Sequence, residues 1–197
     1  MTENKTTEMQ RLEILRLSNA ESNRITKTCI ESAMILLMKD KCFHDISITD
    51  IVKRAGVSRT AYYRNYDSKE DILRSVMKEI VDKVIVAMNL RLPIQNTYDY
   101  WYSLFHMLQQ HADSLKILLM ANFGDAILNE IHSIMQSSVS KNSIQENYKS
   151  YFWSGAIYSV AASWIRDGMQ QTAEEMAKIC YQIIDHMNED CHSTQKE

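Results

Sequence analysis

The chain has 197 residues, of which 45% are hydrophobic and 24% are charged, and its formal net charge at pH 7 is −3. This apolar content is sufficient for a packed core and excludes an intrinsically disordered chain. The low number of prolines (one) and glycines (four) favours an all-α fold. No apolar run is long enough to cross a bilayer, so we expect no membrane partner.

The first residues and the cysteines bear on where the protein works. Residues 1–10 are polar and lack the apolar segment of a secretory signal. Four cysteines occur without a CxxC spacing, which is typical of free thiols in a reducing compartment. We therefore expect a cytoplasmic protein that needs no metal and no cofactor.

Residues 1–20 form an N-terminal extension in which leucines and isoleucine are mixed with arginines. A helical extension is one interpretation, and a mobile terminus is the one we favour. A first helix is predicted from about Glu21 to Lys39, because apolar residues recur there at helical spacing.

Residues 47–73 predict two short helices around a tight turn. Ser47 and Asp50 form a capping box that opens the first of them. Gly56 supplies the left-handed backbone that a helix end commonly needs, and Ser58 is the N-cap of the second helix. Two helices around a glycine-bearing turn are typical of the helix-turn-helix, whose second helix lies in the DNA major groove.

The side chains of this segment are suited to binding nucleic acid. Residues 48–65 contain four basic residues and a single acid, Asp50. Arg59 and Thr60, at the start of the second helix, are placed to reach base edges. From spacing alone, an ordinary helical hairpin with solvated charges is the alternative interpretation.

The segment also resembles the DNA-binding signature of the TetR family of one-component transcriptional regulators. The matching residues are Ile48-Thr49, Ile51-Val52, Ala55-Gly56-Val57-Ser58, Tyr63-Arg64-Asn65-Tyr66 and Ser68-Lys69-Glu70-Asp71-Ile72. Tyr66 stands where phenylalanine is usual, and Asn65 stands where histidine is frequent, which leaves one phosphate contact of the family open. The resemblance implies that Tyr63 and Lys69 contact phosphates and that Thr49 contacts DNA. The complete set of predicted DNA-binding residues is Ser47, Thr49, Ser58, Arg59, Thr60, Tyr63, Arg64, Asn65 and Lys69.

These patterns predict a DNA-binding domain of three helices over residues 21–67 and a second helical domain over residues 68–197. A long helix from about Lys69 to Leu90 opens the second domain with a capping box of Ser68 and Asp71. Further helices are predicted from Thr97, over residues 114–122 with Asp113 at the start, over residues 125–138, from Ser143 to Asp167, and from Thr172 with Glu175 as its capping partner.

In the resembling family the second domain binds a small-molecule effector and forms a homodimer, so the resemblance implies both for this chain. Aromatic and polarisable side chains are frequent in this domain and are suited to an apolar pocket. The predicted ligand-binding residues are Trp101, Phe105, His111, Met120, Tyr151 and Tyr158. For each of them, packing in an ordinary core is the alternative.

The last two helices are the predicted dimer interface. Small residues share one face of the long helix, which lets another helix approach closely, and the last helix has a broad apolar stripe. The predicted interface residues are Phe152, Gly155, Ala156, Ser159, Ile179 and Ile183. The alternative is that this face packs only within its own subunit.

Taken together, the residues and the resemblance predict a ligand-responsive repressor that binds a palindromic operator in double-stranded DNA as a homodimer. No enzyme is expected, because GxSxG, HExxH, P-loop and dinucleotide-binding motifs do not occur. Two alternatives stay open at this point: a helical interaction module without DNA contacts, and an enzyme with a scattered site.

Overall fold

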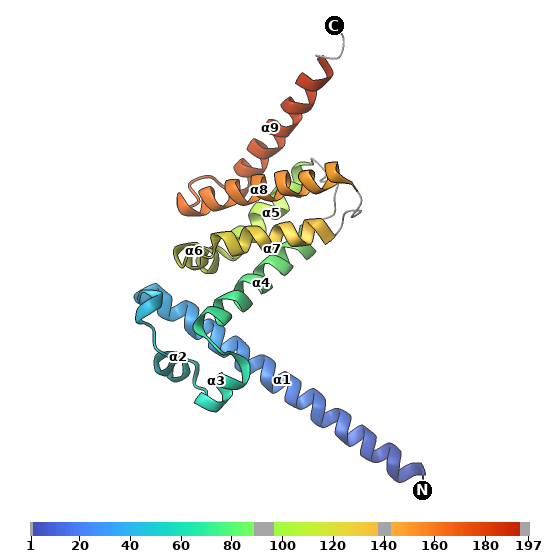
Figure 1. Cartoon of the computed structure of the whole chain (residues 1–197), viewed down its shortest axis with the longest axis vertical. Helices are drawn as coiled ribbons and strands as arrows, with labels where there is room; N and C mark the ends of the chain where they lie inside the picture. The colour runs from blue at the N-terminus through green and yellow to red at the C-terminus, as the bar shows by residue number, and fades with distance from the viewer. Residues whose placement is uncertain (1, 89–96, 138–142, 194–197) are drawn as a thin grey trace. The chain divides into compact units, whose positions relative to one another are not determined.

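The computed structural model describes residues 2–88, 97–137 and 143–193, and side chains within 13–86, 97–137 and 143–186. All regular elements in these ranges are helices, which confirms the predicted all-α fold (Figure 1). The chain forms two compact units, Met1–Ser75 and Val76–Glu197. Because the division falls inside α4 (Lys69–Met88), this helix contributes residues to both units.

The first unit is a head of three helices followed by the start of α4. It contains α1 (Thr2–Asp40), the short 3-10 helix η1 (Phe43–Asp45), α2 (Ile48–Ala55) and α3 (Arg59–Asn65). Both α2 and α3 pack on α1 and on each other. The side chains buried completely in this unit are Ile30, Met34, Ile51, Tyr62, Ile72 and Leu73. Burial of each apolar side chain of this size stabilises the fold by about 1.5–3 kcal/mol.

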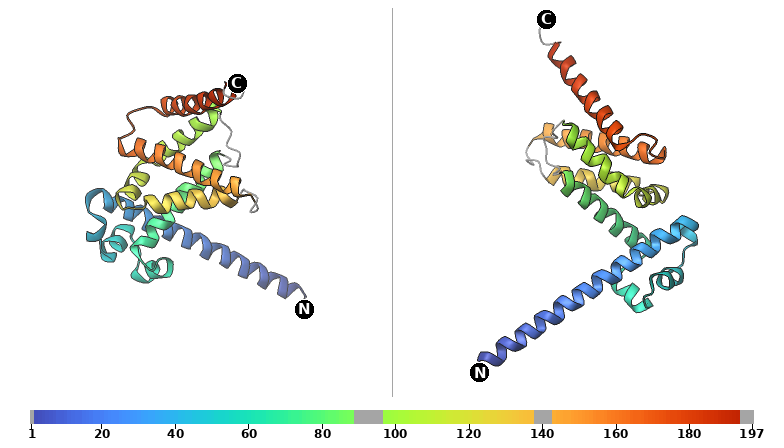
Figure 2. Two further views of the ribbon diagram at one scale, coloured as in Figure 1. Left: turned by 45° about the horizontal axis from the view of Figure 1, so that its top comes forward. Right: turned by 180° about the vertical axis from the view of Figure 1, so that it is seen from behind.

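Helix α1 is longer than the sequence predicted. It begins at Thr2 and not near Glu21, and its first half extends beyond α2 and α3 (Figures 1 and 2). Residues 2–20 lack proline and glycine and are rich in good helix formers, so one helix continues through them. Ile14 and Leu17 in this half are exposed, and no single apolar face marks it. The hydrophobic pattern therefore could not separate a helix from a mobile terminus.

The second unit contains the end of α4 and the remaining helices. These are α5 (Tyr98–Gln110), α6 (Ala112–Met120), α7 (Gly124–Ser137), α8 (Ile144–Arg166) and α9 (Ala173–Ser193). Helix α5 packs on α9, and α8 packs on α7 and α6 (Figure 2). In the core the Phe105 ring meets the Trp164 ring edge-on, with 5.2 Å between their centroids. None of the described helices is long and apolar enough to cross a bilayer.

Most of the predicted helix starts in this unit are confirmed by capping bonds. Thr97 and Ser143 each accept a hydrogen bond from the backbone N–H three residues later, at 3.3 Å in both cases. Thr172 and Glu175 form a reciprocal capping box, with bonds of 2.8 and 3.2 Å. These bonds satisfy N–H groups that the first turn of a helix leaves free.

One predicted start was wrong. Helix α6 begins at Ala112 and not after Asp113, because the non-helical backbone of His111 alone separates it from α5. After α8, Gly168 has the left-handed φ of 78°, as expected for a residue that ends a helix. The predicted end of the α4 helix at Leu90 lies outside the described residues.

Candidate functional site

The start of α2 is fixed by the predicted capping box. Ser47 Oγ accepts from the Asp50 N–H at 3.1 Å, and the Asp50 carboxylate accepts from the Ser47 N–H at 3.0 Å. The bond from the Ser47 backbone holds the pKa of Asp50 below its usual value. Ser68 and Asp71 form the same box at the start of α4, with bonds of 3.0 and 3.1 Å. The caps fix where both helices begin, and thereby hold the exposed Ser47 side chain in place.

The turn between α2 and α3 depends on a glycine. Gly56 has φ 67° and ψ 28°, a left-handed conformation in which any side chain would be strained. The Val57 N–H donates to the Val52 carbonyl at 3.1 Å and closes the end of α2. Ser58 Oγ then accepts from the Ala61 N–H at 3.0 Å and starts α3. The two helices are therefore joined as a helix-turn-helix.

Helix α3 presents one face to the core and the other to solvent. Tyr62 is completely buried, and burial of its hydroxyl raises its pKa. The N-cap of α3 and four of its residues were predicted to contact DNA and are exposed. They are Ser58, Arg59, Thr60, Tyr63 and Arg64. Arg59 Nη2 donates to Thr49 Oγ1 at 2.6 Å, so two predicted DNA contacts from different helices lie side by side. This exposed surface of hydroxyls, guanidiniums and a phenol can bond phosphates and base edges.

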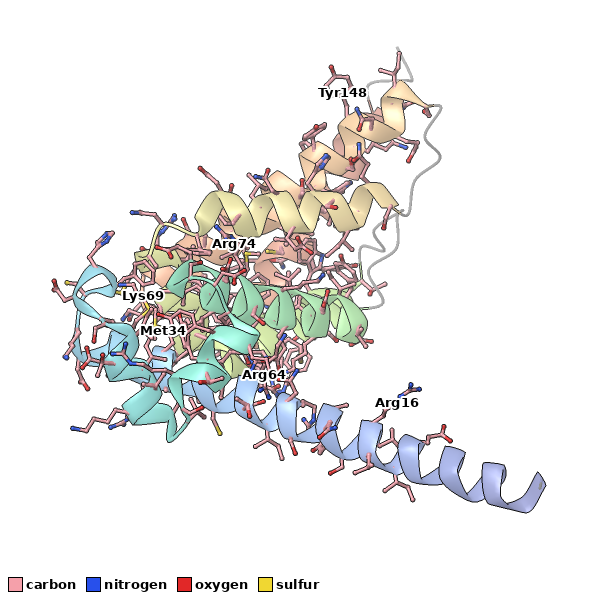
Figure 3. All side chains as sticks on the ribbon, turned by 60° about the horizontal axis from the view of Figure 1, so that its bottom comes forward. Arg16, Met34, Arg64, Lys69, Arg74 and Tyr148 are labelled. Carbon is pink, nitrogen blue, oxygen red and sulfur yellow. The ribbon has the colours of Figure 1, made fainter. Side chains whose placement is uncertain are left out.

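Lys69 is bonded to the backbone of the segment before α2. Its ammonium donates to the carbonyls of Phe43, His44 and Ile46 at 2.9, 3.4 and 2.7 Å, and lies 4.8 Å from the centroid of the Phe43 ring (Figure 3). An ammonium has three hydrogens, and here three carbonyls accept them. In this geometry Lys69 ties η1 to the start of α4, and its contact with a phosphate stays a prediction.

The end of α3 is held against α1. The Tyr66 hydroxyl donates to Glu31 Oε1 at 2.7 Å, a bond that the phenylalanine usual at this position in the family could not make. The Asn65 side-chain amide donates to the Ala61 carbonyl at 2.8 Å, whereas its Oδ1 is buried without a hydrogen-bond partner among the described residues. Asn65 is half-buried, so it is less accessible to DNA than the other predicted contacts of α3.

The second unit encloses an apolar cavity of about 60 Å³. Its lining is aliphatic apart from Tyr158. The lining residues are Ile80, Val81, Val84 and Ile85 of α4, Leu104 and Leu108 of α5, Leu115 and Leu119 of α6, Ile127, Ile131 and Ile134 of α7, and Ile157, Tyr158, Ala161, Ala162 and Ile165 of α8. It therefore lies between α4 and the helices that follow, within the domain to which the resemblance assigns an effector.

Of the predicted ligand-binding residues, Tyr158 lines this cavity and the other five do not. Trp101 and Phe105 are buried in the core. His111 is half-buried between α5 and α6, and burial lowers its pKa.

Met120 and Tyr151 lie at the surface, with 72% and 53% of their side chains exposed. The Tyr151 ring stacks on His132 with 3.7 Å between centroids. Tyr158 is thus the one predicted aromatic residue in the lining, and aliphatic residues form the rest of it.

Comparison with protein families identifies both units. Residues 32–76 match the family described as "Bacterial regulatory proteins, tetR family", and residues 95–186 match the family described as "Transcriptional regulator C-terminal region". The chain belongs to the TetR family of transcriptional regulators. The helix-turn-helix described above is therefore its DNA-binding motif.

Individual relatives of this TetR-family protein are similar over part of their length. The HTH-type transcriptional regulator EthR of Mycobacterium tuberculosis (strain ATCC 25618 / H37Rv) is 35% identical over 52 residues, which are 26% of this chain and 24% of EthR. EthR of Mycobacterium bovis gives the same values. The match thus spans about a quarter of these curated relatives.

Solved structures share the fold over most of the chain. A TetR transcriptional regulator from Streptococcus agalactiae 2603V aligns with a TM-score of 0.52 and 18% identity, over 86% of this chain and 98% of that one. The dihydroxyacetone kinase operon activator DhaS aligns with a TM-score of 0.56 and 17% identity, over 84% and 95%. At these identities the likeness establishes the TetR-family fold.

The predicted dimer residues of α8 and α9 are exposed or half-buried in the second unit of this TetR-family protein. Phe152, Ile179 and Ile183 are 60%, 43% and 54% exposed, Ser159 is exposed, and Gly155 and Ala156 are half-buried. Sequence reasoning missed two exposed apolar residues on the same helix, Ile144 and Tyr148 (Figure 3). They precede Phe152 by eight and four residues, and a search for helical spacing along the whole of α8 would have found them.

Proposed function

We propose that this TetR-family protein is a ligand-responsive repressor that binds a palindromic operator as a homodimer. The observation that carries the proposal is the exposed surface formed by Thr49, Arg59, Thr60 and Tyr63 on a helix-turn-helix with a packed core. These side chains can bond base edges and phosphates without unfolding of the head. Repression requires only that the bound protein occupy DNA needed by the polymerase.

Dimerisation is supported by exposed apolar side chains on α8 and α9. Tyr148 and Phe152 of α8 are 68% and 60% exposed, and Ile183 of α9 is 54% exposed. Large exposed apolar patches on a folded protein mark interaction sites. A second copy with two-fold symmetry would cover the same face on both subunits, and that symmetry matches a palindromic operator.

The response to a ligand is supported by the aliphatic cavity. Its volume of about 60 Å³ is far below the roughly 300–1,000 Å³ of typical ligand sites. An effector would therefore have to widen the cavity, and α4 forms part of its wall with Ile80, Val81 and Val84. Since α4 also carries Ile72 and Leu73 of the head core, widening would favour a different arrangement of the heads. The effector shifts the population only if it prefers the form that does not bind DNA.

The test is a gel shift with DNA fragments recovered from genomic DNA by the purified protein. We expect specific retardation that competitor DNA of mixed sequence does not abolish. Small apolar compounds that change the tryptophan fluorescence should then release the fragment. A protein that retards no fragment would refute the DNA-binding proposal, and compounds that bind without releasing DNA would refute the ligand response.

A further inference from the structure

A polar groove of about 450 Å³ lies between α1 and the second half of α3. Its lining comes from two elements of the head. The residues are Asn19, Ser22, Asn23 and Thr26 of α1, and Ala61, Arg64 and Asn65 of α3. It is separate from the exposed surface formed by Thr49, Arg59, Thr60 and Tyr63.

The groove is polar and carries a net positive charge. Its lining contains one cation, Arg64, and no carboxylate. The nearest acid along α1, Glu21, is neutralised by Arg24, whose guanidinium donates to both carboxylate oxygens at 2.7 and 2.9 Å. Three amides and two hydroxyls complete the lining. The amides and the Ser22 hydroxyl can donate to anionic oxygens, whereas the Thr26 hydroxyl donates to the Ser22 carbonyl.

Asn65 shows that the groove has unused hydrogen-bonding capacity. Its amide nitrogen is engaged by the Ala61 carbonyl, whereas Oδ1 is buried without a partner among the described residues. A buried polar atom without a partner is a place where water or a ligand completes the bonding.

We propose that this groove binds the sugar-phosphate backbone of DNA beside the half-site that α3 reads. The inference rests on the DNA binding proposed above and adds α1 as a second contact element. Arg64 neutralises a phosphate, and Asn19, Asn23 and Asn65 bond the backbone directly or through water. Arg64 lies beside α1, and Arg16 lies on the half of α1 that extends beyond α2 and α3 (Figure 3). The contact orients the head on the duplex and carries no sequence information.

Two threonines of α1 provide a matched test. Thr26 lines the groove and donates to the Ser22 carbonyl at 2.8 Å, whereas Thr28 is exposed outside the groove and donates to the Arg24 carbonyl at 3.1 Å. Thr26→Asp and Thr28→Asp therefore change the net charge equally and remove the same kind of bond. They differ in whether the new carboxylate faces the groove.

The affinity of the full chain for a duplex of mixed sequence should fall about tenfold more with Thr26→Asp than with Thr28→Asp, because the carboxylate then faces a phosphate. Asn23→Asp, which keeps the shape of the side chain, should have the effect of Thr26→Asp, and circular dichroism checks that each variant is folded. Arg64→Gln should lower the slope of log K against log salt by about 0.9. Equal losses of DNA affinity in Thr26→Asp and Thr28→Asp would overturn the proposed groove contact and leave the proposed DNA binding of α3 in place. Failure of the unaltered protein to bind any duplex would overturn the groove and the proposed function together.

Discussion

The Tyr158 hydroxyl occupies the position that a Cβ atom on Gly124 would require. Gly124 is the first residue of α7, and Tyr158 comes from α8 and lines the aliphatic cavity. The missing side chain at residue 124 thus allows the ring to approach the start of α7. This contact therefore links the start of α7 to a residue of the cavity lining.

The first prediction concerns this contact. Gly124→Ala should lower the free energy of unfolding by about 1–3 kcal/mol, because the added methyl group overpacks the site. Tyr158→Phe removes the hydroxyl that the methyl group meets, so the double variant should lose less than the sum of the two single variants. Urea denaturation measures all three. Additive losses would show that Gly124 and Tyr158 are not coupled.

The second prediction concerns Lys69, whose ammonium is bonded to three carbonyls. Lys69→Ala should lower the free energy of unfolding by about 1–2 kcal/mol, because part-buried carbonyls lose a charged donor. Lys53→Ala, at an exposed position of α2, is the control and should change it by less than about 0.5 kcal/mol. If Lys69→Ala keeps full stability but lowers the salt dependence of DNA binding, the phosphate contact expected from the family resemblance is supported.

The third prediction concerns Arg59, at the first turn of α3 and bonded to Thr49. Arg59→Ala should remove about 1–3 kcal/mol of discrimination between the preferred sequence and mixed-sequence DNA. Arg74→Ala removes the same charge from an exposed position of α4 and should leave discrimination unchanged. Competition binding with both DNAs measures the ratio. A ratio that is unchanged in Arg59→Ala would exclude this residue from base readout.

The fourth prediction concerns the exposed face of α8. Ser159→Arg should separate the subunits and abolish operator binding although the head is unchanged, since a charge is then placed in an apolar interface. Ser133→Arg, at an exposed position of α7, should leave the oligomeric state unchanged. Analytical sedimentation at micromolar concentration measures both. A protein that sediments as a monomer before any substitution would contradict the dimer.

The head could be predicted from sequence because its signals are local. The capping boxes at Ser47 and Ser68 and the left-handed turn at Gly56 each involve residues at most a few positions apart, and the structure contains all of them. The bonds of Lys69 could not be predicted, because its acceptors precede it by 23 to 26 residues. The same local reasoning missed the first half of α1, which has no packed face to mark it.

Most of the residues that line the cavity could not be predicted from the sequence. Aromatic residues were predicted to bind the ligand, yet Trp101 and Phe105 are buried core residues. Most of the cavity lining is isoleucine and leucine. Ile127, Ile131 and Ile134 have the spacing of one helix face, which identifies a buried stripe but not whether that stripe meets a neighbour or an empty space. That distinction depends on how several helices pack, and no local pattern encodes it.

The central claim, a dimeric DNA-binding regulator, is tested most directly by selecting fragments from genomic DNA with the purified full chain and sequencing those that stay bound. We expect enrichment of one inverted repeat whose two halves lie on the same face of the duplex, about one helical turn or a multiple of it apart. The same protein with Arg59→Ala should fail to enrich it. Recovery of fragments without a shared sequence, or of single half-sites alone, would contradict the account.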